Sequence, residues 1–396
     1  MNRLLLLCLP VILICKELSA QPIVKKARFV SEALIFPKQE KHVHASSIVS
    51  LPNGDFLAAW FQGSGERTAD DVKIMGARLI KGSAKWSEPF LLADTPDMPD
   101  CNPVLFLNSK DKLFLVWVAV QANRWEYAIL RYKTATDYSK IGSPLWSWQD
   151  NILLKPDDRF ATETTLKFKK LPKQELGWSE YAHSYDDMII EASQDVRKRS
   201  IGWMTRIKPL LLENGKILLP LYSDGYSFSM MAISNDDGDT WHPSLPIISR
   251  GGIQPALVKK KNGNIIAYMR DNGDAPARVQ LSESSDKGES WSAAIKTAIP
   301  NAGSSVELLA LLDGRWAFIG NDVEDGRYRL SLYFSEDEGK TWKFKAVLEN
   351  EEPNKGSFSY PSLIQTADGL LHITYSYTSG SKEESIKYVA VNPAWL

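Results

Sequence analysis

The sequence contains little cysteine and little net charge, and these two shortages exclude several classes of protein. Only three of the 396 residues are cysteine, and two of them, Cys8 and Cys15, fall in a predicted leader. The remaining thiol, Cys101, cannot form an internal disulfide, so we expect the folded chain to be stabilised by its core. The formal net charge of −1 at pH 7 argues against a nucleic-acid partner, which would need a basic surface.

The sequence also lacks the patterns that bind metals and phosphates. No His, Cys or carboxylate residues recur at a spacing that would hold a metal ion, and no glycine-rich loop follows a predicted strand. We therefore expect no metal and no cofactor. The longest apolar run, Leu4–Ile14, is too short to cross a bilayer, so no transmembrane segment is expected.

Residues 1–20 have the pattern of a secretory signal peptide. A basic residue precedes the apolar run Leu4–Ile14, and the small residue Ala20 stands at the expected cleavage point. We therefore predict a secreted or periplasmic protein whose mature part, residues 21–396, is a single domain. A lipoprotein attached through Cys15 is the alternative.

An eight-residue motif occurs three times in the second half of the chain. The copies begin about fifty residues apart, which is the spacing of a repeat fold built from similar small units. In each copy an Asp can accept backbone N–H bonds and a Gly can take a positive φ, so we predict a hairpin turn at the same corner of successive sheets. The three copies are Ser234–Trp241, Ser284–Trp291 and Ser335–Trp342.

Six segments alternate apolar and polar residues around a turn, as paired β-strands do. They predict an all-β, six-bladed β-propeller. One gap is oversized: residues 162–200, between the second and third units, are rich in Lys, Glu and Asp and predict an insertion over one face, helical near residues 184–197. A seventh blade there is the alternative. The six segments are Ala45–Trp60, Pro103–Val118, Pro209–Tyr222, Pro255–Met269, Val306–Ile319 and Pro361–Tyr375.

The residue just before each segment begins the innermost strand of its blade, which faces the central channel of a propeller. Strand starts are usually apolar or small, but here they are polar, so the sequence predicts a polar pocket on the axis. In chain order these residues are His44, Asn102, Arg206 or Lys208, Gln254, Ser304 or Ser305, and Tyr360.

The repeated motif, S-x-D-x-G-x-[T/S]-W, resembles the Asp box of the sialidase superfamily, whose members are β-propellers. The similarity extends from about His44 to Tyr375, and the motif itself is expected to be structural. The resemblance implies three arginines that hold a sugar carboxylate, a Tyr nucleophile activated by a Glu, and an Asp that acts as acid on a first-blade loop. Tyr360-Pro-Ser-Leu matches the nucleophile segment. Arg270 and Arg327 match two of the arginines, with Arg329 as the alternative to Arg327.

Three positions depart from the family pattern. His44 stands where the first arginine is expected. Gln254, sixteen residues before Arg270, replaces the Glu and cannot take a proton from Tyr360. The acid loop places Arg67 or Thr68 at the acid position. Glu66, Asp70 or Asp71 could supply the acid only if that loop is gapped. These departures argue against sialic acid hydrolysis as the family performs it.

The remaining residues favour a different reaction on an acidic sugar. Arg270 and Arg327 can clamp a carboxylate, with Arg67 as a third contact. Pairing a uronate carboxylate with Arg270 makes the C5 proton more acidic, and Tyr360 and His44 can exchange the protons. Several propeller lyases that act on uronate glycans are similar in using His, Tyr and Arg. We therefore predict an exported lyase or dehydratase that performs β-elimination on a terminal uronate of an acidic oligosaccharide or polysaccharide.

Two alternatives remain open. The first is an exo-acting glycoside hydrolase of sialidase type with Tyr360 as nucleophile, and the second is a carbohydrate-binding propeller without catalysis. His183, in the insertion, is predicted to reach down as a lid, whereas His242 and His372 are predicted to be structural. The glycan, its linkage and the oligomeric state stay open. The predicted substrate contacts are Arg67, Asp70, Asp71, Asn102, His183, Arg206, Gln254 and Arg327.

Overall fold

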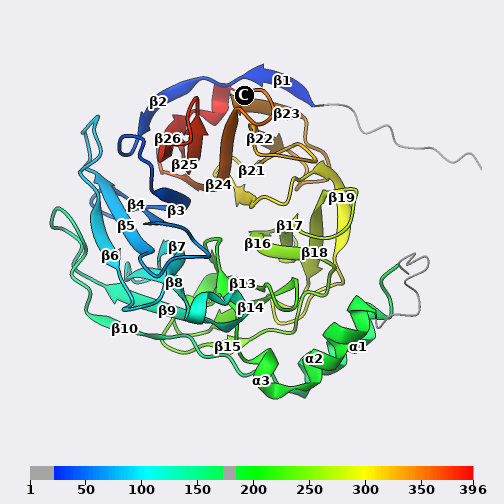
Figure 1. Cartoon of the computed structure of the whole chain (residues 1–396). Helices are drawn as coiled ribbons and strands as arrows, with labels where there is room; N and C mark the ends of the chain where they lie inside the picture. Colours follow the sequence, from blue (N-terminus) through cyan, green and yellow to red (C-terminus); the bar gives the residue numbers. More distant parts are fainter. Residues whose placement is uncertain (1–21, 173–183, 396) are drawn as a thin grey trace, which may run out of the picture.

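The computed structural model describes residues 22–172 and 184–395, which form six sheets arranged around a central axis (Figure 1). The predicted leader, residues 1–20, and the predicted lid residue His183 lie outside this part of the chain. The fold is a six-bladed β-propeller, as the sequence predicts. Within the described residues, no helix is both long and apolar enough to cross a membrane.

Each blade is an antiparallel sheet whose innermost strand comes first in the chain. The inner strands are buried on both faces because each sheet packs between two neighbours. Trp60 and Trp117, for example, are almost fully buried between blades. The strands of the first three blades are β3 His42–Ser50, β4 Phe56–Gly63, β5 Lys73–Leu79, β6 Phe90–Ala93, β7 Asp100–Leu107, β8 Leu113–Val120, β9 Ala128–Ala135, β10 Trp148–Asn151, β11 Met204–Thr205, β12 Leu210–Leu211, β13 Ile217–Ser223, β14 Phe228–Ser234 and β15 His242–Pro243. Those of the last three are β16 Gly252–Lys259, β17 Ile265–Asp271, β18 Arg278–Ser284, β19 Ile295–Pro300, β20 Glu307–Ala310, β21 Trp316–Gly320, β22 Arg329–Ser335, β23 Phe344–Asn350, β24 Gly356–Gln365, β25 Leu371–Ser379 and β26 Glu384–Val391.

The N-terminal strands close the ring. Strand β2 (Phe29–Leu34) pairs antiparallel with β26 and supplies the outer strand of the last blade. Strand β1 (Ile23–Lys26) pairs in parallel with β23 of the blade before it. Figure 1 shows both blue strands along the outer edge of the brown and red blades. The sequence pattern does not predict these two strands, because no local turn joins them to a partner.

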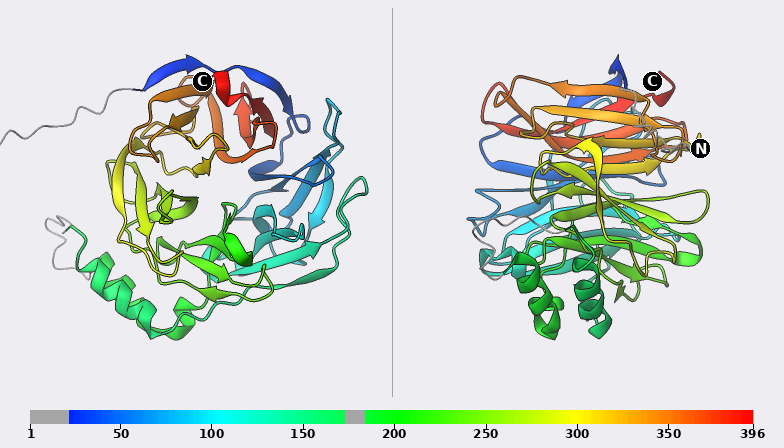
Figure 2. Two further views of the ribbon diagram at one scale, coloured as in Figure 1. Left: turned by 180° about the vertical axis from the view of Figure 1, so that it is seen from behind. Right: turned by 90° about the vertical axis from the view of Figure 1, so that its right-hand side faces the viewer.

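The predicted insertion is present between β10 and β11, and its described residues form three helices, α1 (Asp158–Phe168), α2 (Tyr185–Gln194) and α3 (Val196–Arg199). The helix expected near residues 184–197 is confirmed, and the alternative of a seventh blade is wrong. Helix α1 starts before the predicted insertion boundary, at the N-cap residue Asp157, whose side chain accepts a bond from the N–H of Arg159. The helices lie at the outer edge of the ring beside the third blade, not over its face (Figure 2).

The three Asp boxes each join the third strand of a blade to its fourth and have the same internal bonds. In the central copy, Asp286 Oδ1 accepts from the N–H of Ser290 at 3.0 Å and from Ser284 Oγ at 2.8 Å. Ser284 Oγ in turn accepts from the N–H of Gly288 at 2.9 Å, and Gly288 has a φ of 88°. The other two copies repeat these bonds. The predicted recurring hairpin turn is therefore confirmed.

Replacing Asp286 with alanine is expected to lower the free energy of unfolding by about 2 kcal/mol, because several bonds to one carboxylate are lost together. Denaturant titration of both proteins measures the difference. The matched control is Asp325→Ala, which removes a carboxylate from an exposed loop and should change the free energy of unfolding by less than about 0.5 kcal/mol. Equal losses in the two variants would contradict a structural role for the Asp box.

Candidate active site

Four of the six innermost strands begin with the same backbone distortion. The pairing register shifts at a β-bulge near the start of β3, β7, β16 and β24. At each bulge one residue other than glycine has a φ between 52° and 57°; these residues are Ala45, Asn102, Gln254 and Tyr360. Such conformations cost energy and persist where the surrounding structure imposes them, often at functional sites. In the first blade this residue is Ala45, so His44 reaches the axis from one position earlier.

Tyr360 lies at the centre of the polar cluster on the axis. Its hydroxyl oxygen accepts a hydrogen bond from Arg270 Nη1 at 2.6 Å. The guanidinium of Arg327 lies 5.1 Å from the centre of the Tyr360 ring. The imidazole of His44 lies on the ring as well, with the two ring centres 4.1 Å apart. The three catalytic residues predicted from the sequence, Tyr360, His44 and Arg270, are therefore neighbours.

The positive charges of the arginines change the acidity of the phenol. Burial acts to raise the pKa of Tyr360, but Arg270 and Arg327 lower it more strongly, and the pKa lies below its ordinary value. Gln254 adds a hydrogen bond that acts in the same direction. Since Gln254 cannot accept a proton, the arginines, not a neighbouring base, make Tyr360 a stronger acid.

His44 is uncharged at neutral pH. Burial lowers the pKa of His44 well below its usual range, and the positive charges of Arg327, His42, Arg206 and Arg270 lower it further. An uncharged imidazole can accept a proton. The pair therefore consists of a proton acceptor, His44, in contact with a proton donor of increased acidity, Tyr360.

Two chambers open beside this pair and share Glu66. The first, which we call the tyrosine chamber, has a volume of about 330 Å³. The second, which we call the hydroxyl chamber, has a volume of about 450 Å³. The tyrosine chamber is lined by Glu66, Arg67, Trp125, Tyr222, Asp224, Ser227, Ile253, Gln254, Arg270, Asn272 and Tyr360. The hydroxyl chamber is lined by His42, Val43, His44, Ser64, Gly65, Glu66, Arg327, Ser357, Ser359, Ser376, Thr378 and Glu384.

Six of the predicted site residues line these chambers. They are His44, Arg67, Gln254, Arg270, Arg327 and Tyr360. Arg67 lies over the Trp125 ring at 4.5 Å and pairs with Asp224 at 3.4 Å. Arg327 rather than Arg329 faces the site, because Arg329 bonds Asp322 at 2.6 Å. Glu66 is the one residue of the predicted acid loop with a carboxylate at the chambers.

Other predicted substrate contacts lie outside both chambers. Arg206 is buried behind Tyr360 and donates to the backbone carbonyls of Tyr360 and Ser46 at 2.6 and 3.2 Å. Asn102 donates to the Tyr222 hydroxyl at 3.0 Å. Arg206 and Asn102 therefore stabilise the centre of the propeller and do not line either chamber. The start of a strand fixes where a residue lies, but it does not fix the direction in which its side chain points.

The two aspartates of the acid loop also lie outside the chambers, and both stabilise the loop. Asp71 accepts from the N–H and the hydroxyl of Ser64 at 2.8 and 2.7 Å. Asp70 accepts from the amide of Asn123 at 2.8 Å. Both oxygens of Asp71 and Oδ1 of Asp70 are therefore used in bonds to the protein.

The remaining polar strand starts and the two histidines predicted to be structural are also away from the chambers. Lys208 pairs with Glu307 at 3.1 Å, while Ser304 and Ser305 are fully buried. His372 lies between the hydroxyls of Thr366 and Tyr388 at 2.9 and 2.8 Å, and His242 lies 3.5 Å from Glu289.

The sequence interpretation missed His42, Tyr222, Trp125 and Glu384. His42 lies between two carboxylates, with its ring nitrogens 3.4 Å from Glu66 and 3.1 Å from Glu384. Strand alternation could have identified it, because His42 lies two residues before His44 and points to the same face. Nothing near Glu384 in the sequence indicates that it reaches the first blade. In the described parts of the chain, no group of three or more His, Cys, Asp or Glu residues could hold a metal ion.

His42 should make stability depend on pH. Burial acts to lower the pKa of His42, but the bonds to Glu384 and Glu66 outweigh it and raise the pKa to about 9, from 6.5. Because the folded-state value is the higher one, this stabilisation is complete below about pH 6.5 and is lost as the pH rises through 9. Between those limits the protein should lose about 2 kcal/mol of unfolding free energy relative to a His42→Gln variant. Urea titrations at several pH values measure this, and parallel pH dependences in the two proteins would contradict it.

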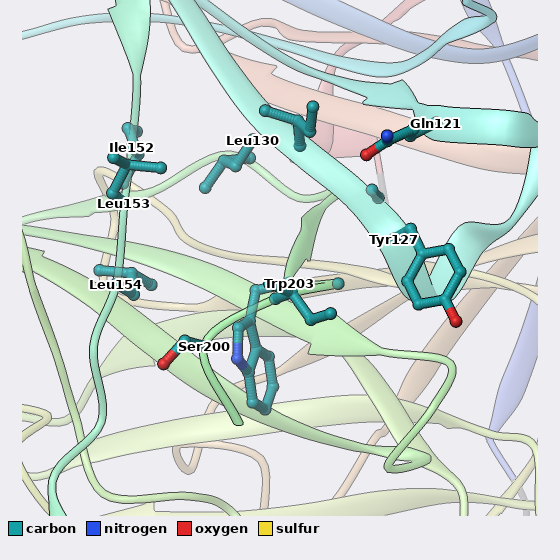
Figure 3. A pocket seen from close by; sticks show the side chains of 12 residues that line it. Gln121, Tyr127, Leu130, Ile152, Leu153, Leu154, Ser200 and Trp203 are labelled. Carbon is teal, nitrogen blue, oxygen red and sulfur yellow. The ribbon is translucent and has the colours of Figure 1, made fainter. Parts of the chain in front are cut away.

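A third hollow, of about 180 Å³, lies away from the axis. It is bounded by the outer part of the second blade and the chain after α3 (Figure 3). Its lining is mostly apolar and includes Leu130, Ile152, Leu154 and Trp203. None of the predicted site residues lines it.

The fold, the Asp boxes and the axial cluster define a β-propeller of the sialidase superfamily. The chain belongs to the family of BNR repeat-like domains, whose model matches residues 54–205 and 198–373. Among curated proteins it is 26% identical to an anhydrosialidase of Macrobdella decora over 191 residues, or 43% of this chain and 24% of that protein. It is also 26% identical to a sialidase of Paraclostridium sordellii over 143 residues, or 31% of this chain and 33% of that protein. The chain thus matches only a quarter to a third of these relatives.

Solved structures share the fold at low sequence identity. A protein of unknown function from Dyadobacter fermentans superposes with a TM-score of 0.66 and 15% identity, over 92% of this chain and 99% of that one. The intramolecular trans-sialidase of Ruminococcus gnavus, in complex with oseltamivir carboxylate, gives a TM-score of 0.63 and 14% identity over 89% and 95% of the two chains. These similarities support the architecture, and the function has to be argued from the site.

Proposed function

We propose that this protein is an exported enzyme that cleaves a glycan by β-elimination at a uronate residue. The observation that carries the proposal is the pair of Tyr360 and His44, with ring centres 4.1 Å apart, beside Arg270 and with Gln254 in place of a carboxylate. The proposal of export rests on the leader pattern of residues 1–20.

Arg270 and Arg327 are suited to bind the carboxylate of the uronate. Among the described residues, Arg270 donates to Tyr360, Gln254 and Asn272 rather than to a carboxylate. Arg327 lies against the Tyr360 ring. A bound carboxylate would receive charge-assisted bonds from both guanidinium groups. Those bonds withdraw electrons from the carboxylate and make the proton on the adjacent C5 easier to remove.

The two proton-transfer groups are in the states that elimination requires. Neutral His44 takes the C5 proton, the C5–H electron pair forms the C4=C5 double bond, and the C4–O bond breaks. Tyr360 gives its proton to the departing oxygen. The substrate carboxylate neutralises Arg270 and Arg327, which removes part of the charge that weakens His44 as a base. The base is therefore strongest when the substrate is bound.

The test uses uronate-containing oligosaccharides. Elimination produces a conjugated double bond, so the ultraviolet absorbance should rise, and no oxygen from solvent should enter the product. The reaction is run in water enriched in heavy oxygen and the products are weighed by mass spectrometry. Heavy oxygen in the product, without new absorbance, would overturn elimination in favour of hydrolysis.

A second candidate is hydrolysis of sialidase type, which one observation favours. Glu66 lines both chambers and is the carboxylate that could act as acid while Tyr360 acts as nucleophile. Against it, the pKa of Glu66 is lowered: burial acts to raise it, but the bond to His42 and the charges of His42, Arg67 and Arg327 outweigh burial. Glu66 is therefore ionised at neutral pH. Release of free sialic acid from sialyllactose would favour this candidate, and binding of both substrates without turnover would leave a carbohydrate-binding propeller.

A Gln254→Glu variant separates the two reactions. A carboxylate at this position would pair with Arg270 and raise the pKa of Tyr360, so elimination should fall by about tenfold or more. Hydrolysis would instead gain the missing base and should increase. Rates on both substrate classes measure the change, and Gln149→Glu, on the exposed strand β10 of the second blade, controls for an added charge. An unchanged elimination rate would contradict the role given to Arg270.

A further inference from the structure

The hydroxyl chamber has a wall built from four hydroxyl side chains. Ser357 is paired with Thr378, and Ser359 with Ser376, across strands β24 and β25. Alternate residues of a strand point to the same face, so the four hydroxyls lie together. The residues between them, Phe358 and Tyr377, are aromatic and pack on each other on the other face, with ring centres 5.3 Å apart. All four hydroxyl residues line the chamber.

One of these hydroxyls is buried without a partner. Ser359 is 1% exposed, and its Oγ has no hydrogen-bond partner among the described residues. A buried polar atom without a partner costs free energy, so it normally indicates an absent ligand group or an ordered water. The Ser376 hydroxyl accepts from the N–H of Ala45 at 3.1 Å, and it donates its own proton to none of the residues that the structure describes.

The opposite side of the chamber carries two carboxylates and two cations, His42 and Arg327. Glu66 and Glu384 are held on either side of His42, and Glu384 also accepts from the N–H of Val43 at 2.7 Å. These carboxylates accept bonds from sugar hydroxyls, and together with His42 and Arg327 they leave the chamber without a net positive charge that would attract a second anionic sugar. The remaining cation, Arg327, faces the Tyr360 ring, where the uronate carboxylate is proposed to bind.

From this lining we infer that the hydroxyl chamber binds a neutral sugar, the residue on the other side of the bond that is cleaved. The inference rests on the proposed function and extends it to a substrate class, glycans in which O4 of a uronate is bonded to an uncharged sugar. The two chambers share Glu66 and meet at the Tyr360–His44 pair. A disaccharide that occupied both chambers would place its glycosidic bond at that pair.

Binding measurements test the inference without turnover. Isothermal titration of the full chain carrying Tyr360→Phe compares glucuronic acid, a mixed disaccharide in which xylose is bonded to O4 of glucuronic acid, and a disaccharide of two uronic acids. The mixed disaccharide should bind at least about tenfold more tightly than either of the others, because several hydroxyl bonds are added without repulsion. Equal affinities, or tighter binding of the diuronate, would overturn the inference.

Variants of the hydroxyl wall test whether these residues bind the neutral sugar. Ser359→Ala removes the unpartnered hydroxyl, and Thr378→Met fills part of the chamber. Both variants should reduce the extra affinity of the mixed disaccharide and leave the affinity for glucuronic acid unchanged. Ser381→Met, on the exposed turn of the same blade, should change neither. A thermal melt confirms that each variant is folded. Unchanged binding of the mixed disaccharide in both wall variants would overturn the inference. Absence of glucuronic acid binding in every protein would instead refute the proposed function itself, and the inference with it.

Discussion

Tyr360→Phe should lower turnover by about a thousandfold, because proton donation to the departing oxygen is lost. Phenylalanine keeps the ring that contacts His44 and Arg327, so the affinity for the substrate should change little. The expected signature is a fall in kcat with nearly constant KM. Steady-state rates on a uronate oligosaccharide measure both quantities.

Tyr388→Phe is the matched control. Tyr388 is also a mostly buried phenol, but it bonds His372 at 2.8 Å, on the outer part of the last blade. Loss of the Tyr388 hydroxyl should lower the free energy of unfolding by about 1 kcal/mol and leave kcat unchanged. Full activity in Tyr360→Phe would remove Tyr360 from the chemistry.

Arg270→Gln is expected to reduce kcat/KM by about a hundredfold and also to change the pH profile. The variant loses a charge-assisted bond to the substrate carboxylate. It also loses a positive charge that lowers the pKa of Tyr360. Since elimination needs protonated Tyr360, activity declines once the pH exceeds that pKa. Removing the charge raises the pKa, so the alkaline limb of the profile should move to higher pH.

The direction of this shift distinguishes two roles of the arginine. A residue that only bound substrate would lower kcat/KM without moving the alkaline limb. Arg278→Gln is the control, because Arg278 lies in the same blade and pairs with Glu324 at 2.6 Å, away from both chambers. A limb that stayed in place, or moved to lower pH, would contradict the effect of Arg270 on Tyr360.

Local patterns made much of the fold predictable. Each Asp box is a complete turn within eight residues, and each blade contains its own paired strands, so both the repeat and the number of blades follow from short stretches of sequence. The strands β1 and β2 were not predictable in this way. Their partners, β23 and β26, lie more than three hundred residues away, and no local signal indicates such a pairing.

The site was predictable to the extent that it follows strand starts and family spacing. Tyr360, Gln254 and Arg270 are adjacent in the structure, as their motif and interval imply. The same reasoning gave Arg206 a place at the axis, but its guanidinium is used by backbone carbonyls behind Tyr360. Contacts between the first and last blades, such as His42 with Glu384, depend on ring closure, which short patterns cannot show.

The pairing of β2 with β26 has a consequence for how the molecule is made. As the nascent chain leaves the ribosome, β2 emerges more than three hundred residues before its partner β26. Strand β2 must therefore wait, with an open edge, until β26 has been synthesised. Tyr360, in β24, also emerges after the first five blades, so a chain truncated before β24 would hold neither a closed ring nor Tyr360.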